Sequence, residues 1–167
     1  MENLEELVAA HQGSLFAFLY RMCGDADVAE DLMQETFVRA LRAAGRFRPQ
    51  AEVRTWLFSI ATNLVKDRWR REARRGPEVS LHESMVAAND LPEQVVLEKL
   101  GQDEVRQALL QLPLPYRSTL VLRYYHDLTY AQIARVLFCP LGTVRSRIHN
   151  GLARLKQILM GTEGVQP

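Results

Sequence analysis

Apolar residues recur at spacings of three and four along most of this 167-residue chain, and this spacing constrains the fold more than any other feature. One such run extends from Leu4 to Met22, a second from Val28 to Ala44 and a third from Trp56 to Val65. No segment alternates apolar and polar residues between turn-forming glycines or asparagines, so strands are not expected. The pattern predicts an all-α protein.

The periodic pattern stops between Gly76 and about Pro92, where the charged residues are acidic and turn-forming residues punctuate the chain. It resumes near Glu93. The interruption predicts two small helical domains joined by a flexible acidic linker. We expect the boundaries at residues 1–76, 77–92 and 93–160.

Local signals indicate where some helices begin. Asp27 with Glu30 three residues later resembles a capping box, so a helix is expected to start there. Pro113 and Pro115 are expected to break the chain ahead of a helix over about residues 116–125.

Charge is sorted into blocks, although the formal net charge is only +1. The net charges are −3 for residues 1–50, +4 for 51–76, −6 for 77–104 and +6 for 105–167. Two basic segments joined by an acidic connector suggest two separate contacts with a polyanion. A plainer interpretation is that these charged residues lie on solvent-exposed faces of helices.

The sharpest motif lies near the C-terminus. Thr129 and Gln132 form a capping box ahead of a short helix, a tight turn follows, and a longer helix is expected over about residues 141–159. This is the geometry of a helix-turn-helix, whose second helix enters the DNA major groove. Phe138 occupies the turn position that favours glycine, so backbone strain is expected there.

The outward face of the longer helix carries side chains suited to DNA. Arginine can form two hydrogen bonds to a guanine edge, and hydroxyl and basic groups bind phosphates. An ordinary helical hairpin with a basic face is the alternative. The candidate DNA-contacting residues are Thr143, Arg145, Ser146, Arg147, His149, Asn150, Arg154 and Lys156.

Several classes of protein are excluded. The longest stretch without Asp, Glu, Lys or Arg runs only from Leu7 to Tyr20, too short and too polar to span a bilayer, and no secretion signal is expected. Cys23 and Cys139 form no CxxC pair, which fits the cytoplasm and gives neither a zinc nor a disulfide framework. Because the four histidines are scattered, no catalytic residue, metal, cofactor or small-molecule substrate is expected.

Two sets of motifs follow one another along the chain. The first half contains DVAEDLMQETF at residues 27–37 and WLFSIATN at 56–63; the second contains LTYAQIA at 128–134 and CPLGTVRSRI at 139–148. Over about residues 3–160 the chain resembles bacterial RNA polymerase sigma factors of the extracytoplasmic-function (ECF) subfamily. The resemblance implies a first domain that binds core RNA polymerase and the promoter −10 element, and a second domain that reads the −35 element.

The resemblance also implies roles for individual residues. Carboxylates and an amide on the second helix would bind arginines of the polymerase clamp helices. The third helix would bind a melted −10 strand, because extruded bases can stack while cations hold the backbone. The polymerase-binding residues would be Asp31, Gln34 and Glu35; the −10 residues Arg54, Asn63, Lys66, Asp67 and Arg70; and the −35 residues Thr143, Arg145, Ser146, Arg147 and His149.

Three aromatic residues of this first half admit different interpretations. Trp56 best fits core packing, Trp69 fits either the core or base stacking, and Phe37 fits either the core or the polymerase-facing surface. By resemblance, the linker would thread through polymerase, whereas a plain flexible tether is the alternative. Members of the family are often held inactive by an anti-sigma factor, which is therefore an expected partner beside core polymerase and promoter DNA.

Three other classes of function are alternatives. A helix-turn-helix regulator that acts without joining polymerase would explain residues 105–160 but neither the acidic helix nor the helix that mixes tryptophan with basic residues. A nuclease would need a carboxylate–histidine cluster, and the sequence offers none. An all-helical adaptor that binds only protein would have no affinity for DNA.

Overall fold

The computed structural model describes residues 3–46, 52–74 and 102–161. Over these residues it contains seven α-helices, one short 3₁₀-helix and no strand, so the all-α prediction is confirmed. The linker expected at 77–92 lies outside the described residues. The elements are α1 (Leu4–Cys23), α2 (Ala26–Arg42), η1 (Ala44–Arg46), α3 (Val53–Arg74), α5 (Gln102–Leu110), α6 (Leu114–Tyr124), α7 (Tyr130–Leu137) and α8 (Leu141–Leu159).

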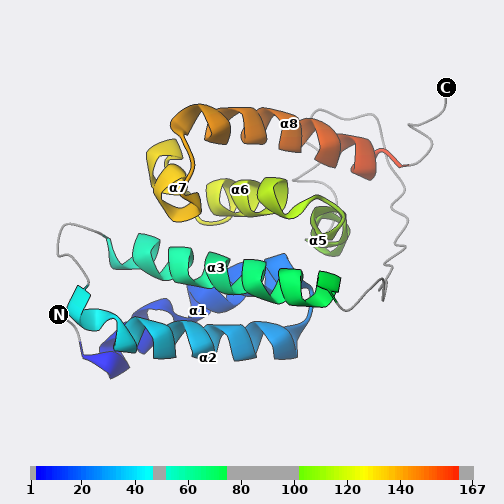
Figure 1. Cartoon of the computed structure of the whole chain (residues 1–167). Coiled ribbons are helices and arrows are strands. Elements are labelled where there is room, and N and C mark those ends of the chain that lie inside the picture. The colour runs from blue at the N-terminus through cyan, green and yellow to red at the C-terminus, as the bar shows by residue number, and fades with distance from the viewer. Residues whose placement is uncertain (1–2, 47–51, 75–101, 162–167) are drawn as a thin grey trace.

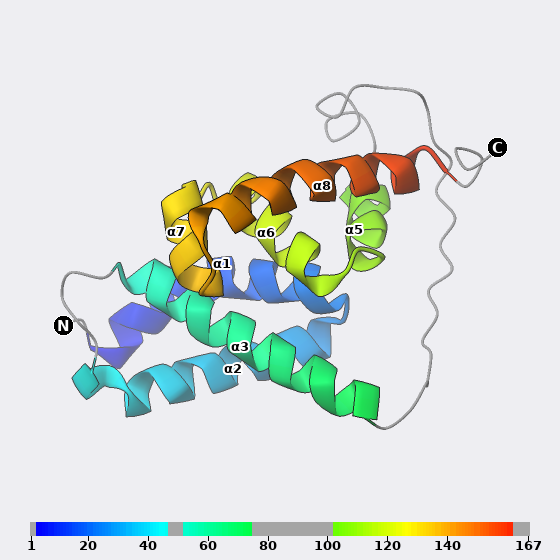
Figure 2. The ribbon, with the colours of Figure 1, turned by 45° about the horizontal axis from the view of Figure 1, so that its top comes forward.

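The helices form two layers (Figure 1). Helices α1, α2 and α3 contact one another in the first layer, while α6, α7 and α8 contact one another in the second and α5 packs against α8. The layers also touch, because α3 contacts α7 and α1 contacts both α5 and α6 (Figure 2). The two halves of the sequence therefore pack against each other.

Asp25 caps α2, so the capping box expected at Asp27 and Glu30 is wrong. The Asp25 Oδ1 atom accepts hydrogen bonds from the backbone N–H groups of Asp27 at 2.9 Å and Val28 at 3.1 Å. Asp25 follows Gly24, which ends α1 with φ of 77°. This places Asp25 in the extended conformation that a capping residue needs.

Helix α6 begins at Leu114, so the start expected near residue 116 is too late. Pro113 lies just before the helix and Pro115 within its first turn. Proline fits there because the first N–H groups of a helix have no partner inside the helix.

Arg117 of α6 is a buried cation that ties several helix ends together. Its guanidinium donates to the carbonyl oxygens of Leu109 at 2.9 Å, Leu110 at 3.0 Å and Leu112 at 2.9 Å, and also to that of Met22 in the last turn of α1. Burial lowers the pKa of Arg117, but an arginine stays protonated in proteins. The side chain therefore joins α6 of the second layer to α1 of the first.

His126 lies between the two layers and is only 7% exposed. The centre of its ring is 5.9 Å from that of Phe18 on α1 and 4.9 Å from that of Phe58 on α3. Its Nε2 atom is buried with no hydrogen-bond partner among the described residues. An uncharged imidazole suits this aromatic environment.

The burial of His126 should make stability depend on pH. Desolvation lowers the pKa of His126 from 6.5 to about 4; the positive charges of Arg21 and Arg54 add to this effect, and Asp127 opposes it. Between these pH values the folded chain binds fewer protons than the unfolded chain. The free energy of unfolding should therefore fall as pH drops through this window and be fully restored above about pH 6.5.

Urea titrations between about pH 7.5 and pH 5 measure this dependence. The variant His126→Asn should lose most of the slope, because it has no ionisable group at this position. An equal slope in the wild type and the variant would contradict the assignment.

Candidate nucleic-acid and partner interfaces

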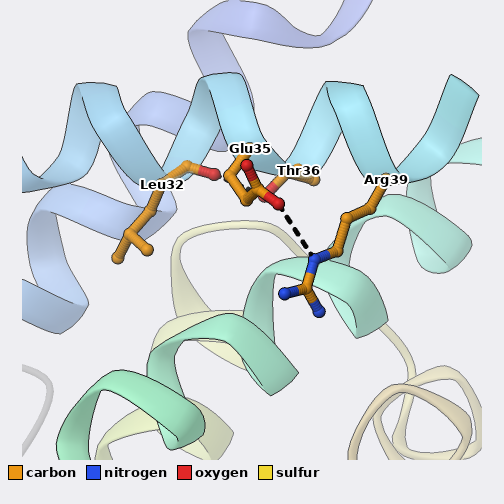
Figure 3. Close-up of polar contacts among 4 residues, drawn as sticks. All are labelled: Leu32, Glu35, Thr36 and Arg39. Atoms are coloured by element: carbon orange, nitrogen blue, oxygen red, sulfur yellow. Dashed lines mark hydrogen bonds and ion pairs between the residues drawn. The ribbon is translucent and has the colours of Figure 1, made fainter. Parts of the chain in front are cut away.

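Helix α2 carries an exposed face of acidic and amide side chains. Asp31 and Gln34 are exposed, and Glu35 is half-buried. The Arg39 Nε atom donates to Glu35 Oε2 at 3.2 Å, and both side chains keep nearly half of their area exposed (Figure 3). Because exposed ion pairs contribute little stability, Glu35 can exchange Arg39 for an arginine of a partner.

The opposite face of α2 is fixed by packing. Leu32, Thr36 and Phe37 are buried, and the Thr36 hydroxyl donates to the Leu32 carbonyl oxygen at 2.7 Å. Phe37 therefore belongs to the core. Its burial sets the rotation of α2 and thus directs the three predicted polymerase-binding residues away from the core.

The five −10 candidates all lie on α3 but differ in their surroundings. Asn63 is exposed. Asp67 Oδ1 accepts a hydrogen bond from Arg70 Nη1 at 3.1 Å, an ion pair that holds the arginine along the helix. Arg54 is half-buried, with its guanidinium carbon 5.9 Å from the centre of the Phe58 ring.

A groove of about 410 Å³, called here the α3 groove, lies between α3, the start of α6 and the turn of the helix-turn-helix. Lys66, Trp69 and Arg70 line it from α3, and Phe138 and Arg147 line it from the other domain. Candidates for two different DNA elements therefore face one groove.

The two tryptophans of α3 have different roles. Trp56 is half-buried against the core, as expected from its spacing. Trp69 is 54% exposed, so the core interpretation of this residue is wrong. An exposed indole among basic side chains is suited to stacking on a base.

Helices α7 and α8 form the predicted helix-turn-helix. The Thr129 hydroxyl accepts from the Gln132 N–H at 3.1 Å, and Gln132 Oε1 accepts from the Thr129 N–H at 2.8 Å, so this capping box is confirmed. Val144 is fully buried where the two helices cross. Phe138 has φ of 54°, the left-handed conformation expected for this turn.

The −35 candidates on α8 differ in how exposed they are. Arg145, Ser146 and His149 are exposed, while Thr143 is half-buried. Arg147 is also half-buried and donates toward the Cys139 Sγ atom at 3.9 Å. Two residues are a rotation of about 200° on an α-helix, so Arg147 lies on a different side of α8 from Arg145.

Both halves of the chain match models of known sigma factor domains. Sigma-70 region 2 matches residues 7–75, and Sigma-70 region 4 matches residues 102–155. These two regions define a sigma factor. Comparison with individual sigma factors shows the subfamily.

The ECF RNA polymerase sigma factor SigW of Bacillus subtilis is 33% identical over 163 residues, which cover 92% of this chain and 87% of SigW. The RNA polymerase sigma-H factor of Pseudomonas aeruginosa is 37% identical over 151 residues, covering 85% and 78% of the two chains. The chain belongs to the ECF sigma factors, as its motifs predicted. It thus binds core RNA polymerase and directs initiation at promoters.

Two solved structures share the fold. One is the sigma factor RpoE in complex with the anti-sigma factor NepR from Bartonella quintana, with a TM-score of 0.75, 23% identity and coverage of 93% of this chain and 95% of RpoE. The other is CnrH in complex with the cytosolic domain of CnrY, with a TM-score of 0.66, 27% identity and coverage of 93% and 86%.

Within the described ranges, no helix has both the length and the apolar character needed to cross a membrane. The same residues contain no group of three or more His, Cys, Asp or Glu side chains placed to hold a metal ion.

The variant Phe138→Gly should stabilise the chain. A non-glycine residue in the left-handed region costs on the order of 1 kcal/mol, and little packing is lost because Phe138 is 73% exposed. We expect the free energy of unfolding, measured by urea titration, to rise by less than that amount, because glycine also gives the unfolded chain more conformational freedom. The matched control is Asp127→Gly. Asp127 also has a left-handed backbone, with φ of 56°, but the variant should gain less stability because aspartate tolerates this conformation. If the Phe138→Gly variant were less stable than the wild type, backbone strain at this position would be contradicted.

Proposed function

We propose that this sigma factor uses three separate surfaces: α2 for core polymerase, α3 for the melted −10 strand and α8 for the −35 duplex. The observation that carries the proposal is the exposed acidic and amide face of α2, whereas α3 and α8 expose basic side chains. One chain then offers one surface suited to a protein with arginines and two suited to nucleic acid.

At the polymerase surface, Asp31, Gln34 and Glu35 would accept or donate hydrogen bonds to the partner. Carboxylates bind arginine in short, charge-assisted hydrogen bonds, which are stronger than neutral ones. The contact of Glu35 with Arg39 holds that carboxylate within the face of α2 before the partner arrives.

At the −10 surface, the exposed Asn63 amide both donates and accepts hydrogen bonds, so it can read a base edge. Trp69 offers a stacking platform for an unpaired base. Arg54, Lys66 and Arg70 would hold the phosphates, and Asp67 would orient Arg70 through their ion pair.

At the −35 surface, Arg145 would contact a guanine edge from the exposed face of α8, with His149 one turn further along. Thr143, Ser146 and Arg147 would bind phosphates and so fix the position of the helix in the groove. Sequence discrimination then depends on Arg145 more than on its neighbours.

We further propose that the factor works in the cytoplasm with domains at residues 1–76 and 93–160, a linker at 77–92 and control by an anti-sigma factor. The likeness to CnrH, whose structure contains the cytosolic domain of CnrY, supports a protein partner of this kind. The chemistry of RNA synthesis belongs to polymerase, so the chain itself is not an enzyme.

Run-off transcription with bacterial core polymerase and a library of genomic fragments tests the surfaces. The variant with Asp31→Ala and Glu35→Ala should weaken polymerase binding about thirtyfold, since two hydrogen bonds of roughly 1 kcal/mol each are lost. The control Glu5→Ala removes an exposed acid from α1 and should bind polymerase normally.

The variant Arg145→Ala should keep its polymerase affinity but lose about tenfold or more of its discrimination between correct and altered −35 sequences. Transcripts from mapped start sites with single-base changes in the −35 element measure this loss. If Arg145→Ala weakened polymerase binding, and the α2 variant lost −35 discrimination instead, the assignment of α2 and α8 would be overturned.

A further inference from the structure

The α3 groove combines an apolar lining with positive charge. Its volume of about 410 Å³ lies in the range of small-molecule sites, which often form where two domains meet. Lys66, Arg70 and Arg147 bring three positive charges to it, and none of the described residues that line it is acidic. Its aliphatic surface comes from Met22, Val65, Leu114 and Leu137. Such a site suits a ligand that is mostly apolar and carries a negative charge.

Two exposed aromatic rings line the groove, one from each domain. Trp69 of α3 is 54% exposed, and Phe138, in the turn before α8, is 73% exposed. Phe138 also has a left-handed backbone, with φ of 54°, where glycine would be unstrained. Strained residues are concentrated at functional sites, where they are part of the mechanism. At this position the phenylalanine brings a ring to the groove, so an aromatic ligand is expected.

A buried hydroxyl beside the groove has no partner. Thr62 lines the groove and is 2% exposed, and its Oγ1 atom makes no hydrogen bond to any described residue. By contrast, the Thr36 and Thr119 hydroxyls donate to carbonyl oxygens one turn back in their helices, each at 2.7 Å. A buried polar group without a partner destabilises a fold. Because threonine adopts two side-chain rotamers in helices, the Thr62 hydroxyl can turn toward an anion in the groove.

We propose that the α3 groove binds a small aromatic anion, a flat ring system that carries a phosphate or carboxylate group. The ring packs against Trp69 and Phe138. The three cations of the groove hold the anion through charge-assisted hydrogen bonds, and Thr62 donates a further one.

The ligand also affects DNA binding, and this part of the proposal rests on the function proposed above. Lys66, Trp69 and Arg70 line the groove and are the same residues that are proposed to hold the −10 strand. A bound aromatic anion occupies the indole and the cations that the strand needs. The ligand and single-stranded DNA therefore compete, so the ligand is an inhibitor of initiation.

Two fluorescent dyes with the same aromatic body test the binding to the full chain. Anilinonaphthalene sulfonate (ANS) carries a sulfonate, which stands in for the phosphate or carboxylate, whereas N-phenylnaphthylamine is neutral. We expect saturable binding of ANS and about tenfold weaker binding of the neutral dye, because the hydrogen bonds to a charged group are lost.

Unlabelled competitors distinguish the two possible anions. Naphthyl phosphate and naphthoate share the ring system and differ in the charged group. At least one of them should displace ANS, and the tighter competitor shows which anion the groove prefers. If neither displaced the dye, the proposed ligand class would be overturned.

Two variants locate the site on the groove. Arg147→Ala should weaken ANS binding about tenfold, whereas Arg135→Ala, which removes an exposed arginine of α7 that does not line the groove, should bind ANS normally. Thr62→Val keeps the shape of the side chain and removes the hydroxyl, so it should weaken ANS binding about fivefold with no loss of stability in urea titrations. Equal ANS affinity in all of these variants and the wild type would overturn the site.

The variant Phe138→Gly separates ligand binding from stability. It relieves the backbone strain but removes a ring from the groove, so it should bind ANS about tenfold more weakly while remaining at least as stable as the wild type. Asp127→Gly is again the matched control and should bind ANS like the wild type. If Phe138→Gly bound ANS as tightly as this control, the role of the ring would be overturned.

Competition with DNA is measured separately, by fluorescence anisotropy of a labelled random-sequence single strand of about 20 nucleotides. The competitor that displaces ANS should also displace this strand from the wild type. If the strand bound but ANS did not, the groove site would be overturned and the proposed function would stand. If ANS bound the groove but its competitor displaced no strand, the competition would be overturned, together with the −10 assignment of Lys66, Trp69 and Arg70.

Discussion

The buried guanidinium of Arg117 is the interaction on which the arrangement of the helices depends. The last carbonyl groups of a helix have no partner within it, and a cation at that end is favourable. Arg117 meets this need at the end of α5 through Leu109, Leu110 and Leu112, and at the end of α1 through Met22. One side chain therefore fixes α6 against α5 and the second layer against the first.

The four hydrogen bonds of Arg117 are divided unequally between the two layers. Three join it to α5 and the residues that follow, within its own domain, and one joins it to Met22 in the other. If the layers separate, the guanidinium keeps three partners and the Met22 carbonyl oxygen can bind water. The second domain therefore satisfies most of its buried cation without help from the first.

Features encoded by a few neighbouring residues could be predicted from the sequence, and features set by distant contacts could not. The capping box of Thr129 with Gln132 and the left-handed turn at Phe138 are local and were confirmed. The cap of α2 was assigned to Asp27 instead of Asp25, because two acidic residues compete and only the geometry after Gly24 decides between them.

The surroundings of the candidate site residues depend on tertiary packing in the same way. Helical spacing places Lys66 and Arg70 on one side of α3, but it cannot show that this side lines a groove shared with the helix-turn-helix. His126 was one of four scattered histidines in the sequence, and only the approach of Phe18 and Phe58 makes it the centre of an interface.

Charge sets how firmly the two layers can pack against each other. The +4 and +6 segments of the sequence meet across the α3 groove, where Lys66, Arg70 and Arg147 share one space. Like charges repel, and Asp67 offsets this only at Arg70. The aromatic contacts of His126 and the hydrogen bond from Arg117 to Met22 therefore act against a repulsion that a nucleic-acid backbone would remove.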